Sequence, residues 1–233
     1  MLKSSSTPRV LFTRELSKKR IHFFATKGII AEGVPFISVS AKPVRQWRHK
    51  IPAYSDAWVF TSQNAVSAIS PLLKDLQIPN NVFAVGEQTS EALSVLGLDA
   101  IIPDESNARK LAELISSYTP NQVVYFCGNL RKETLALTLA REKIPFQTVE
   151  VYETVLSPQA MDMDHFDAIT FMSPSSATSF FEMNLLPANF PVFCIGETTG
   201  SALQNYGIRH YLTAEISTFT SLAHRIITYF NRC

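Results

Sequence analysis

Short apolar runs alternate with amphipathic segments along the whole chain. The amphipathic segments show helical spacing, as in Leu222, Ile226 and Tyr229, which lie three or four residues apart. Strands that alternate with helices are typical of parallel sheets covered by helices on both faces. The pattern therefore predicts an α/β fold with ten strands in two parallel sheets of five strands each. The predicted strands are residues 10–13, 35–39, 57–61, 82–85, 100–102, 123–126, 146–151, 168–171, 192–195 and 209–212.

The chain contains one internal repeat. Residues 82–98 match residues 192–208 at an offset of 110, with 8 identities in 17 positions. Residues 56–62 match residues 167–173 at an offset of 111. The units of solenoid proteins are shorter, about 20–50 residues. The repeat therefore predicts two similar domains.

In each copy, two predicted strands run directly into a Ser or Thr that we expect to open a helix. These residues are Ser62 and Thr89 in the first copy and Ser173 and Thr198 in the second. Their side-chain oxygens suit the N-cap position, and Gly86 allows a sharp turn before Thr89. The carboxyl ends of parallel strands bind ligands in open sheets, and helix N-termini favour anions there. Two interpretations stay open: structural caps, or an anion site in a cleft between similar halves.

Composition and charge narrow the class of protein. The chain has 233 residues, 46% hydrophobic and 18% charged, which excludes a disordered or fibrous protein. It has no apolar run of membrane-spanning length and no secretory signal, and three widely spaced cysteines without a C-x-x-C motif. We therefore expect a cytoplasmic protein with reduced thiols, no disulfide framework and no membrane association.

The net charge of +1 is unevenly distributed. Residues 1–50 contain 11 Lys and Arg against two acids, a net of +9, and residues 51–233 contain 10 against 18, a net of −8. The basic positions are interleaved with apolar ones, so we expect solvated faces of an α/β unit and no nucleic-acid partner. An alternative that stays open is that the basic residues create a local positive field that attracts a small polyanion. The basic segment 42–50 either contacts substrate or faces water.

Motifs for nucleotide, metal or serine-hydrolase chemistry are absent from the sequence. Neither a P-loop nor a G-x-G-x-x-G occurs, nor H-E-x-x-H nor G-x-S-x-G, and the five histidines are scattered. We therefore expect neither a metal site nor a nucleotide site.

Six short motifs follow one another along the chain. They are Phe60-Thr-Ser62, Val85-Gly-x-x-Thr89, Cys127-Gly-Asn-Leu-Arg131, Val151-Tyr-Glu-Thr154, Phe171-Met-Ser-Pro174 and Ile195-Gly-x-Thr-Thr199. Each motif is weakly specific, but their order and spacing resemble the uroporphyrinogen-III synthase family from Val10 to about Phe230. Two departures are Glu15 and Gln63, where Pro is common in the family, and they leave Arg14 as a weaker site candidate.

The resemblance implies an architecture that differs from the two sequence halves. One domain would combine residues 1–37 with 157–233, and the other would span residues 44–148. Residues 38–43 and 149–156 would be linking strands that form a hinge, with the substrate cleft between the domains. The family further implies a monomer.

The resemblance also implies a reaction. Members of the family close the linear tetrapyrrole hydroxymethylbilane to uroporphyrinogen III, with inversion of ring D and loss of water, and need no cofactor. A transient contact with the preceding pathway enzyme would fit an unstable substrate. The alternative is a non-catalytic two-domain module that binds an anionic tetrapyrrole or a similar ligand.

Matching positions supply the candidate residues. Tyr152 is the catalytic candidate, because its phenol could assist departure of the ring-A hydroxyl. The substrate-binding candidates are Arg14, Ser62, Gly86, Thr89, Asn129, Ser173, Ser175, Thr198 and Thr199.

Overall fold

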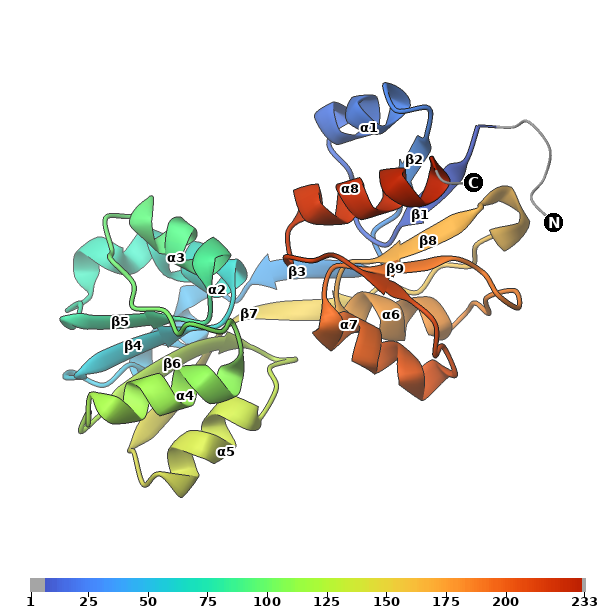
Figure 1. The fold of residues 1–233 in the computed structure, drawn as a ribbon. Coiled ribbons are helices and arrows are strands. Elements are labelled where there is room, and N and C mark those ends of the chain that lie inside the picture. The colour runs from blue at the N-terminus through green and yellow to red at the C-terminus, as the bar shows by residue number, and fades with distance from the viewer. Residues whose placement is uncertain (1–6, 232–233) are drawn as a thin grey trace. The chain divides into compact units, whose positions relative to one another are not determined.

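The computed structural model describes residues 7–231 and contains two five-stranded sheets with helices on both faces (Figure 1). The strands are β1 (Arg9–Phe12), β2 (Ile30–Gly33), β3 (Ile37–Ala41), β4 (Ala57–Phe60), β5 (Asn81–Ala84), β6 (Val123–Gly128), β7 (Phe146–Leu156), β8 (Ala168–Phe171), β9 (Val192–Cys194) and β10 (Leu212–Thr213). The α-helices are α1 (Lys18–Ala25), α2 (Gln63–Ile69), α3 (Glu87–Ser94), α4 (Ala108–Ser117), α5 (Thr134–Arg141), α6 (Pro174–Phe181), α7 (Glu197–Leu203) and α8 (Phe219–Phe230). The 3-10 helices are η1 (Val44–Gln46), η2 (Arg48–Lys50), η3 (Ser70–Asp75), η4 (Met163–His165) and η5 (Gln204–Tyr206).

The first sheet has the order β10-β9-β8-β1-β2, and each neighbouring pair is parallel. Helices α1 and α8 pack on one face through Phe24, Leu222 and Ile226. Helices α6 and α7 pack on the other face through Phe180 and Leu203. The strands are therefore buried on both sides, which explains their continuous apolar sequences.

The second sheet has the order β3-β7-β6-β4-β5. Helices α2 and α3 cover one face and helices α4 and α5 cover the other, as their core clusters show (Figure 1). Every residue of β4 and of β6 is buried, as expected for central strands of a covered sheet.

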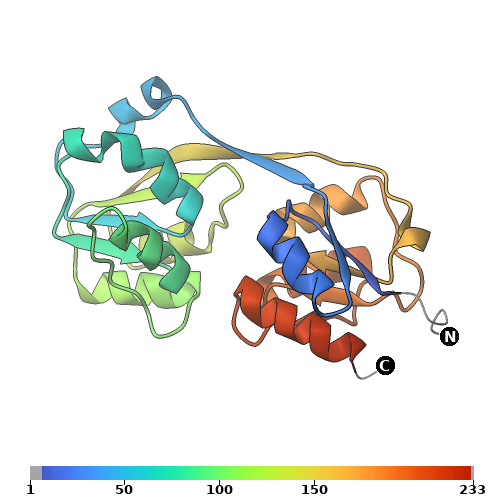
Figure 2. The same cartoon turned by 90° about the horizontal axis from the view of Figure 1, so that it is seen from above.

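The prediction of a fully parallel second sheet is wrong, because β3 runs antiparallel to β7 (Figure 2). Ser157 N–H donates to Phe36 O at 2.9 Å, and Lys42 N–H donates to Val151 O at 2.8 Å, the reversed pairing of an antiparallel ladder. The other three pairs of the sheet are parallel. Strand β3 is an edge strand with mostly exposed residues, so its sequence carries no apolar pattern that indicates the direction of its pairing.

The predicted strands correspond to the observed ones, with a few differences. The strand predicted at 35–39 is β3, and β2 was missed because Ile-Ala-Glu-Gly is short and half polar. Residues 100–102 make only an isolated bridge, Phe83 to Ile101. The strand predicted at 209–212 begins at Leu212, and the strand predicted at 146–151 extends to Leu156.

Contacts between Cα atoms divide the chain into two compact units. The first unit comprises Met1–Ser38 with Val155–Cys233, and the second comprises Val39–Thr154. The chain passes from one unit to the other within β3 and returns within β7. In the described residues, none of the helices combines the length and apolar character that a membrane span requires.

Candidate functional site

The strand ends of the two units show the duplicated arrangement that the repeat predicts. Ser62 is the N-cap of α2, and its side chain accepts a hydrogen bond from Asn64 N–H at 3.1 Å. Ser173 is the N-cap of α6 and accepts from Ser176 N–H at 3.1 Å. The cap prediction is confirmed for these two serines.

The cap prediction is wrong for Thr89 and Thr198. Glycine occupies the N-cap of α3 and of α7, at Gly86 and Gly196. A Cβ at either glycine would lie 2.4 Å from a serine Oγ, Ser106 or Ser217 respectively. The chain segment before α4 or α8 therefore packs against the start of α3 or α7, so a side chain at either cap would force the serine hydroxyl to move.

The equivalent of Thr89 in the second copy is Thr199. Both threonines are the third residue of their helix and both are buried, at 5% and 2% exposure. Thr198 lies one position earlier and is exposed. The offset of 110 in the repeat leads directly to Thr199, whereas pairing the first Thr of each motif leads to Thr198.

Hydroxyl groups gather where β1 and β8 end in the first unit. The Thr13 hydroxyl lies 3.0 Å from both Thr170 O and Ser176 Oγ and accepts from Met172 N–H at 3.2 Å. The hydroxyls of Ser173 and Ser175 lie 3.2 Å apart. No local sequence signal marks Thr13 as part of this group, because only the sheet order brings the end of β1 next to the end of β8.

Arg14 follows Thr13 in the turn after β1 and is exposed. Within the described residues, the Arg14 side chain forms no hydrogen bond with the hydroxyl groups of Thr13 or Ser175.

Tyr152 lies in β7 of the second unit and is half-buried against Gly128. A Cβ at Gly128 would lie 2.4 Å from Cε2 and Cζ of the Tyr152 ring. Burial raises the pKa of the Tyr152 phenol above its ordinary value, and hydrogen bonding with Ser62 opposes part of the rise. The phenol is therefore protonated at neutral pH and available as a donor.

The Cys127–Arg131 motif contacts the Val151–Thr154 motif and Glu150, the residue just before that motif. The Asn129 side chain donates to Thr154 O at 3.0 Å and accepts from Thr154 N–H at 2.8 Å. Arg131 forms an ion pair with Glu150 at 2.8 Å. The Asn129 amide is thus engaged with the protein backbone, so its first role is structural.

Two cysteines lie in the sheet cores. Cys127 and Cys194 are buried, and burial raises the pKa of each thiol to about 12. Among the described residues, no group of three His, Cys, Asp or Glu side chains is placed to hold a metal ion.

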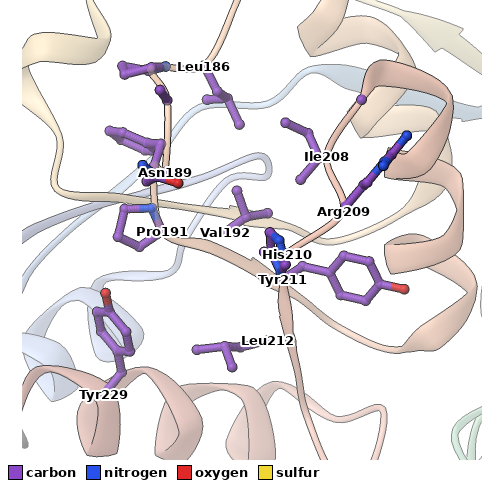
Figure 3. Close-up of a pocket in the computed structure, with 14 residues that line it drawn as sticks. Leu186, Asn189, Pro191, Val192, Ile208, Arg209, His210, Tyr211, Leu212 and Tyr229 are labelled. Atoms are coloured by element: carbon purple, nitrogen blue, oxygen red, sulfur yellow. The ribbon is translucent and has the colours of Figure 1, made fainter.

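The first unit has a cavity of about 720 Å³ at the amino ends of β9 and β10. It lies between the segments that precede these strands, with Asn189 and Pro191 on one side and Ile208 and Arg209 on the other (Figure 3). The starts of α6 and α7 lie at the carboxyl ends of the strands. The cavity is therefore at the opposite end of the sheet from the candidate residues Ser173 and Thr199.

Known proteins resemble the chain over nearly its full length. Residues 19–224 match a family model described as Uroporphyrinogen-III synthase HemD. The fold is similar to that of uroporphyrinogen-III synthetase from Helicobacter pylori, with a TM-score of 0.66, 18% identity, and 95% of this chain and 99% of that chain covered.

Two structures of uroporphyrinogen III synthase from Thermus thermophilus are also similar. A mutant form gives a TM-score of 0.66 at 17% identity, covering 97% of this chain and 98% of that chain. The wild type gives 0.57 at 16% identity with the same coverage. At such identities these likenesses show a shared fold.

Proposed function

The chain belongs to the uroporphyrinogen-III synthase family, and we propose that it performs the family's reaction with the groups at its strand ends and Tyr152. The reaction is that of a cyclising lyase, which closes hydroxymethylbilane to uroporphyrinogen III with inversion of ring D and loss of water. The family match over residues 19–224 is the observation that carries this conclusion.

The proposed binding groups suit a polycarboxylate substrate. Helices α2, α3, α6 and α7 each begin where a parallel strand ends, and helix N-termini favour negative charge. The proposed hydroxyl contacts are Ser62, Ser173, Ser175, Thr89, Thr198 and Thr199, with Gly86 at the turn before α3 and Arg14 as a further contact. Support comes from the same arrangement in both copies of the repeat, which a single structural cap would not require.

The proposed role of Tyr152 is to donate a hydrogen bond or a proton to the departing ring-A hydroxyl. Its raised pKa keeps the phenol protonated, and its ring is held against Gly128. The substrate closes spontaneously to the symmetric isomer, so the main task of the enzyme is to hold ring D for attack at its substituted carbon. Catalysis of this kind depends on positioning, with fixed dipoles in support.

The proposed domains are residues 1–37 with 157–233 and residues 44–148, linked by residues 38–43 and 149–156. A hinge in these strands would let a cleft close over the substrate. Support comes from the division of contacts at Val39 and Thr154, inside the two strands that connect the units. We further propose a cytoplasmic monomer that uses no cofactor and meets the preceding pathway enzyme transiently.

A coupled assay tests the function. Hydroxymethylbilane is generated in place, the protein is added, and the oxidised products are separated into uroporphyrin isomers I and III. Predominance of isomer III is expected. Isomer I alone, formed at the rate of the reaction without protein, would contradict the proposed synthase activity and favour the non-catalytic binding module.

Ser62 allows a test that separates capping from binding. Gly is nearly as good an N-cap as Ser, whereas Ala costs about 1 kcal/mol. We therefore expect Ser62→Gly to keep the free energy of unfolding while raising KM about tenfold, the size expected for one lost hydrogen bond to a carboxylate. Steady-state kinetics and urea unfolding measure the two effects.

The matched control is Asn107, the N-cap of α4, whose side chain accepts from Lys110 N–H at 2.9 Å. Asn107→Gly should leave both KM and stability unchanged. An unchanged KM in Ser62→Gly would remove Ser62 from the binding site.

A further inference from the structure

We infer that Asn129, Arg131, Glu150 and Lys42 form a clamp on β7 that positions Tyr152, and that these are positioning residues for the reaction. The inference rests on the proposed function of Tyr152. The four residues are called the β7 clamp below.

The β7 clamp begins where the regular ladder between β6 and β7 ends. Cys127 pairs with Glu150, and after a shift in register Gly128 pairs with Tyr152. Strand β6 ends at Gly128, so its backbone offers no further regular pairing. The Asn129 side chain continues the pairing, because it satisfies both the N–H and the C=O of Thr154.

The second half of the β7 clamp lies on the other side of Tyr152. Glu150 accepts from Arg131 Nη1 at 2.8 Å through one carboxylate oxygen and from Lys42 Nζ at 2.8 Å through the other. Both cations lower the pKa of the Glu150 carboxyl, so it is ionised at neutral pH. Arg131 also approaches Glu133 at 3.4 Å.

The ion pairs of Glu150 are more sheltered than an ordinary surface pair. The side chains of Arg131 and Lys42 are 22% and 23% exposed, whereas the exposed pair on α4 has Arg109 at 73%. Reduced exposure weakens screening by water and salt, so the geometry around Glu150 is held more firmly.

The two halves of the β7 clamp fix the strand two residues before and two residues after Tyr152. The register shift lies between Glu150 and Tyr152, so the β7 clamp holds the backbone of the strand on both sides of Tyr152 and does not contact the ring itself. Gly128 supports the ring from β6. The phenol therefore has little freedom to translate, which a reaction that depends on positioning requires.

The test combines a structural probe with kinetics. The variants are Asn129→Ala, Arg131→Gln and Glu150→Gln, each made in the wild type and in Tyr152→Phe. We expect each to lower kcat for isomer III, by up to about 100-fold, with little change in KM. In the Tyr152→Phe background the same variants should cause almost no further loss, and Arg131→Lys should restore part of the rate.

A probe independent of activity is 3-fluorotyrosine placed at position 152. Its fluorine NMR resonance should shift or broaden in the three variants. Two controls remove similar interactions elsewhere: Asn184→Ala deletes an amide that accepts from Met161 N–H at 2.7 Å, and Glu113→Gln deletes the pair with Lys110. These controls should leave both the resonance and kcat unchanged.

Two results would overturn the inference. One is an unmoved resonance in all three variants, and the other is a loss of kcat that is equally large without the Tyr152 hydroxyl. Failure of the proposed function looks different: Tyr152→Phe itself would turn over normally, while a shifted resonance would still support the β7 clamp.

Discussion

Tyr152→Phe is expected to fold and bind substrate normally but to form isomer III about 10² to 10⁴ times more slowly, the range of general acid catalysis. The substitution removes one hydroxyl and keeps the ring that packs against Gly128. Stability should therefore change little, and the loss should appear in kcat. The proportion of isomers I and III and single-turnover kinetics measure it.

The pH dependence of the same phenol provides a second readout. Burial raises the pKa of Tyr152 in the folded protein, so the proton stays bound beyond the ordinary value of about 10. A proton held more tightly in the folded state stabilises that state below the unfolded pKa, and this contribution is lost as pH rises through the folded pKa. Ionisation of Tyr152 should thus not reduce activity below about pH 10. The difference in tyrosinate absorbance between wild type and Tyr152→Phe locates the pKa.

The control for this prediction is Tyr118→Phe in the same unit. Tyr118 is 45% exposed at the end of α4, and its ring lies 5.2 Å from that of Phe83. The Tyr118→Phe variant also loses a phenol hydroxyl, but far from β7. It should therefore keep the wild-type rate and the wild-type proportion of isomers. Equal turnover of Tyr152→Phe and Tyr118→Phe would exclude an acid role for Tyr152.

The sequence predicts burial better than it predicts strand direction. The apolar runs that became β4, β6 and β8 are visible because both faces of each strand are covered. The antiparallel pairing of β3 was not visible, because an exposed edge strand has no hydrophobic pattern that records its partner. Strand β2 was missed for a related reason, since Glu32 and Gly33 interrupt a run of only four residues.

The roles of the candidate site residues were predictable where they depend on neighbours in the sequence. They were not predictable where they depend on contacts between distant parts of the chain. Ser62 and Ser173 cap helices through hydrogen bonds within three residues, which a sequence reveals. Gly86 replaces a serine cap because Ser106, 20 residues later, occupies the space. The hydrogen bonds between Asn129 and Thr154 join positions 25 residues apart and depend on the register of two strands, so no local signal in the sequence predicts them.

Gly128→Ala is expected to damage both stability and product selection. The new Cβ would lie 2.4 Å from Cε2 and Cζ of Tyr152 and 2.9 Å from its hydroxyl oxygen. The Tyr152 ring must move, because Gly128 belongs to a buried central strand and β7 is tied at Thr154. Overpacking of this kind costs about 1–3 kcal/mol, and a displaced phenol should lower isomer III formation by up to about 100-fold.

Gly97→Ala separates the two effects of the glycine substitution. Gly97 has a φ of +79°, and a Cβ there would meet no described atom within 4 Å. Alanine in this left-handed conformation costs about 1–2 kcal/mol, a loss similar to that expected for Gly128→Ala, but it displaces nothing near Tyr152. Urea unfolding should therefore show similar losses of stability for the two variants, while only Gly128→Ala changes the proportion of isomers.

If both variants made isomer III equally well, the position of the Tyr152 ring would be irrelevant to the reaction. If Gly128→Ala lost further turnover in the Tyr152→Phe background, its effect would reach the substrate by a route other than the phenol.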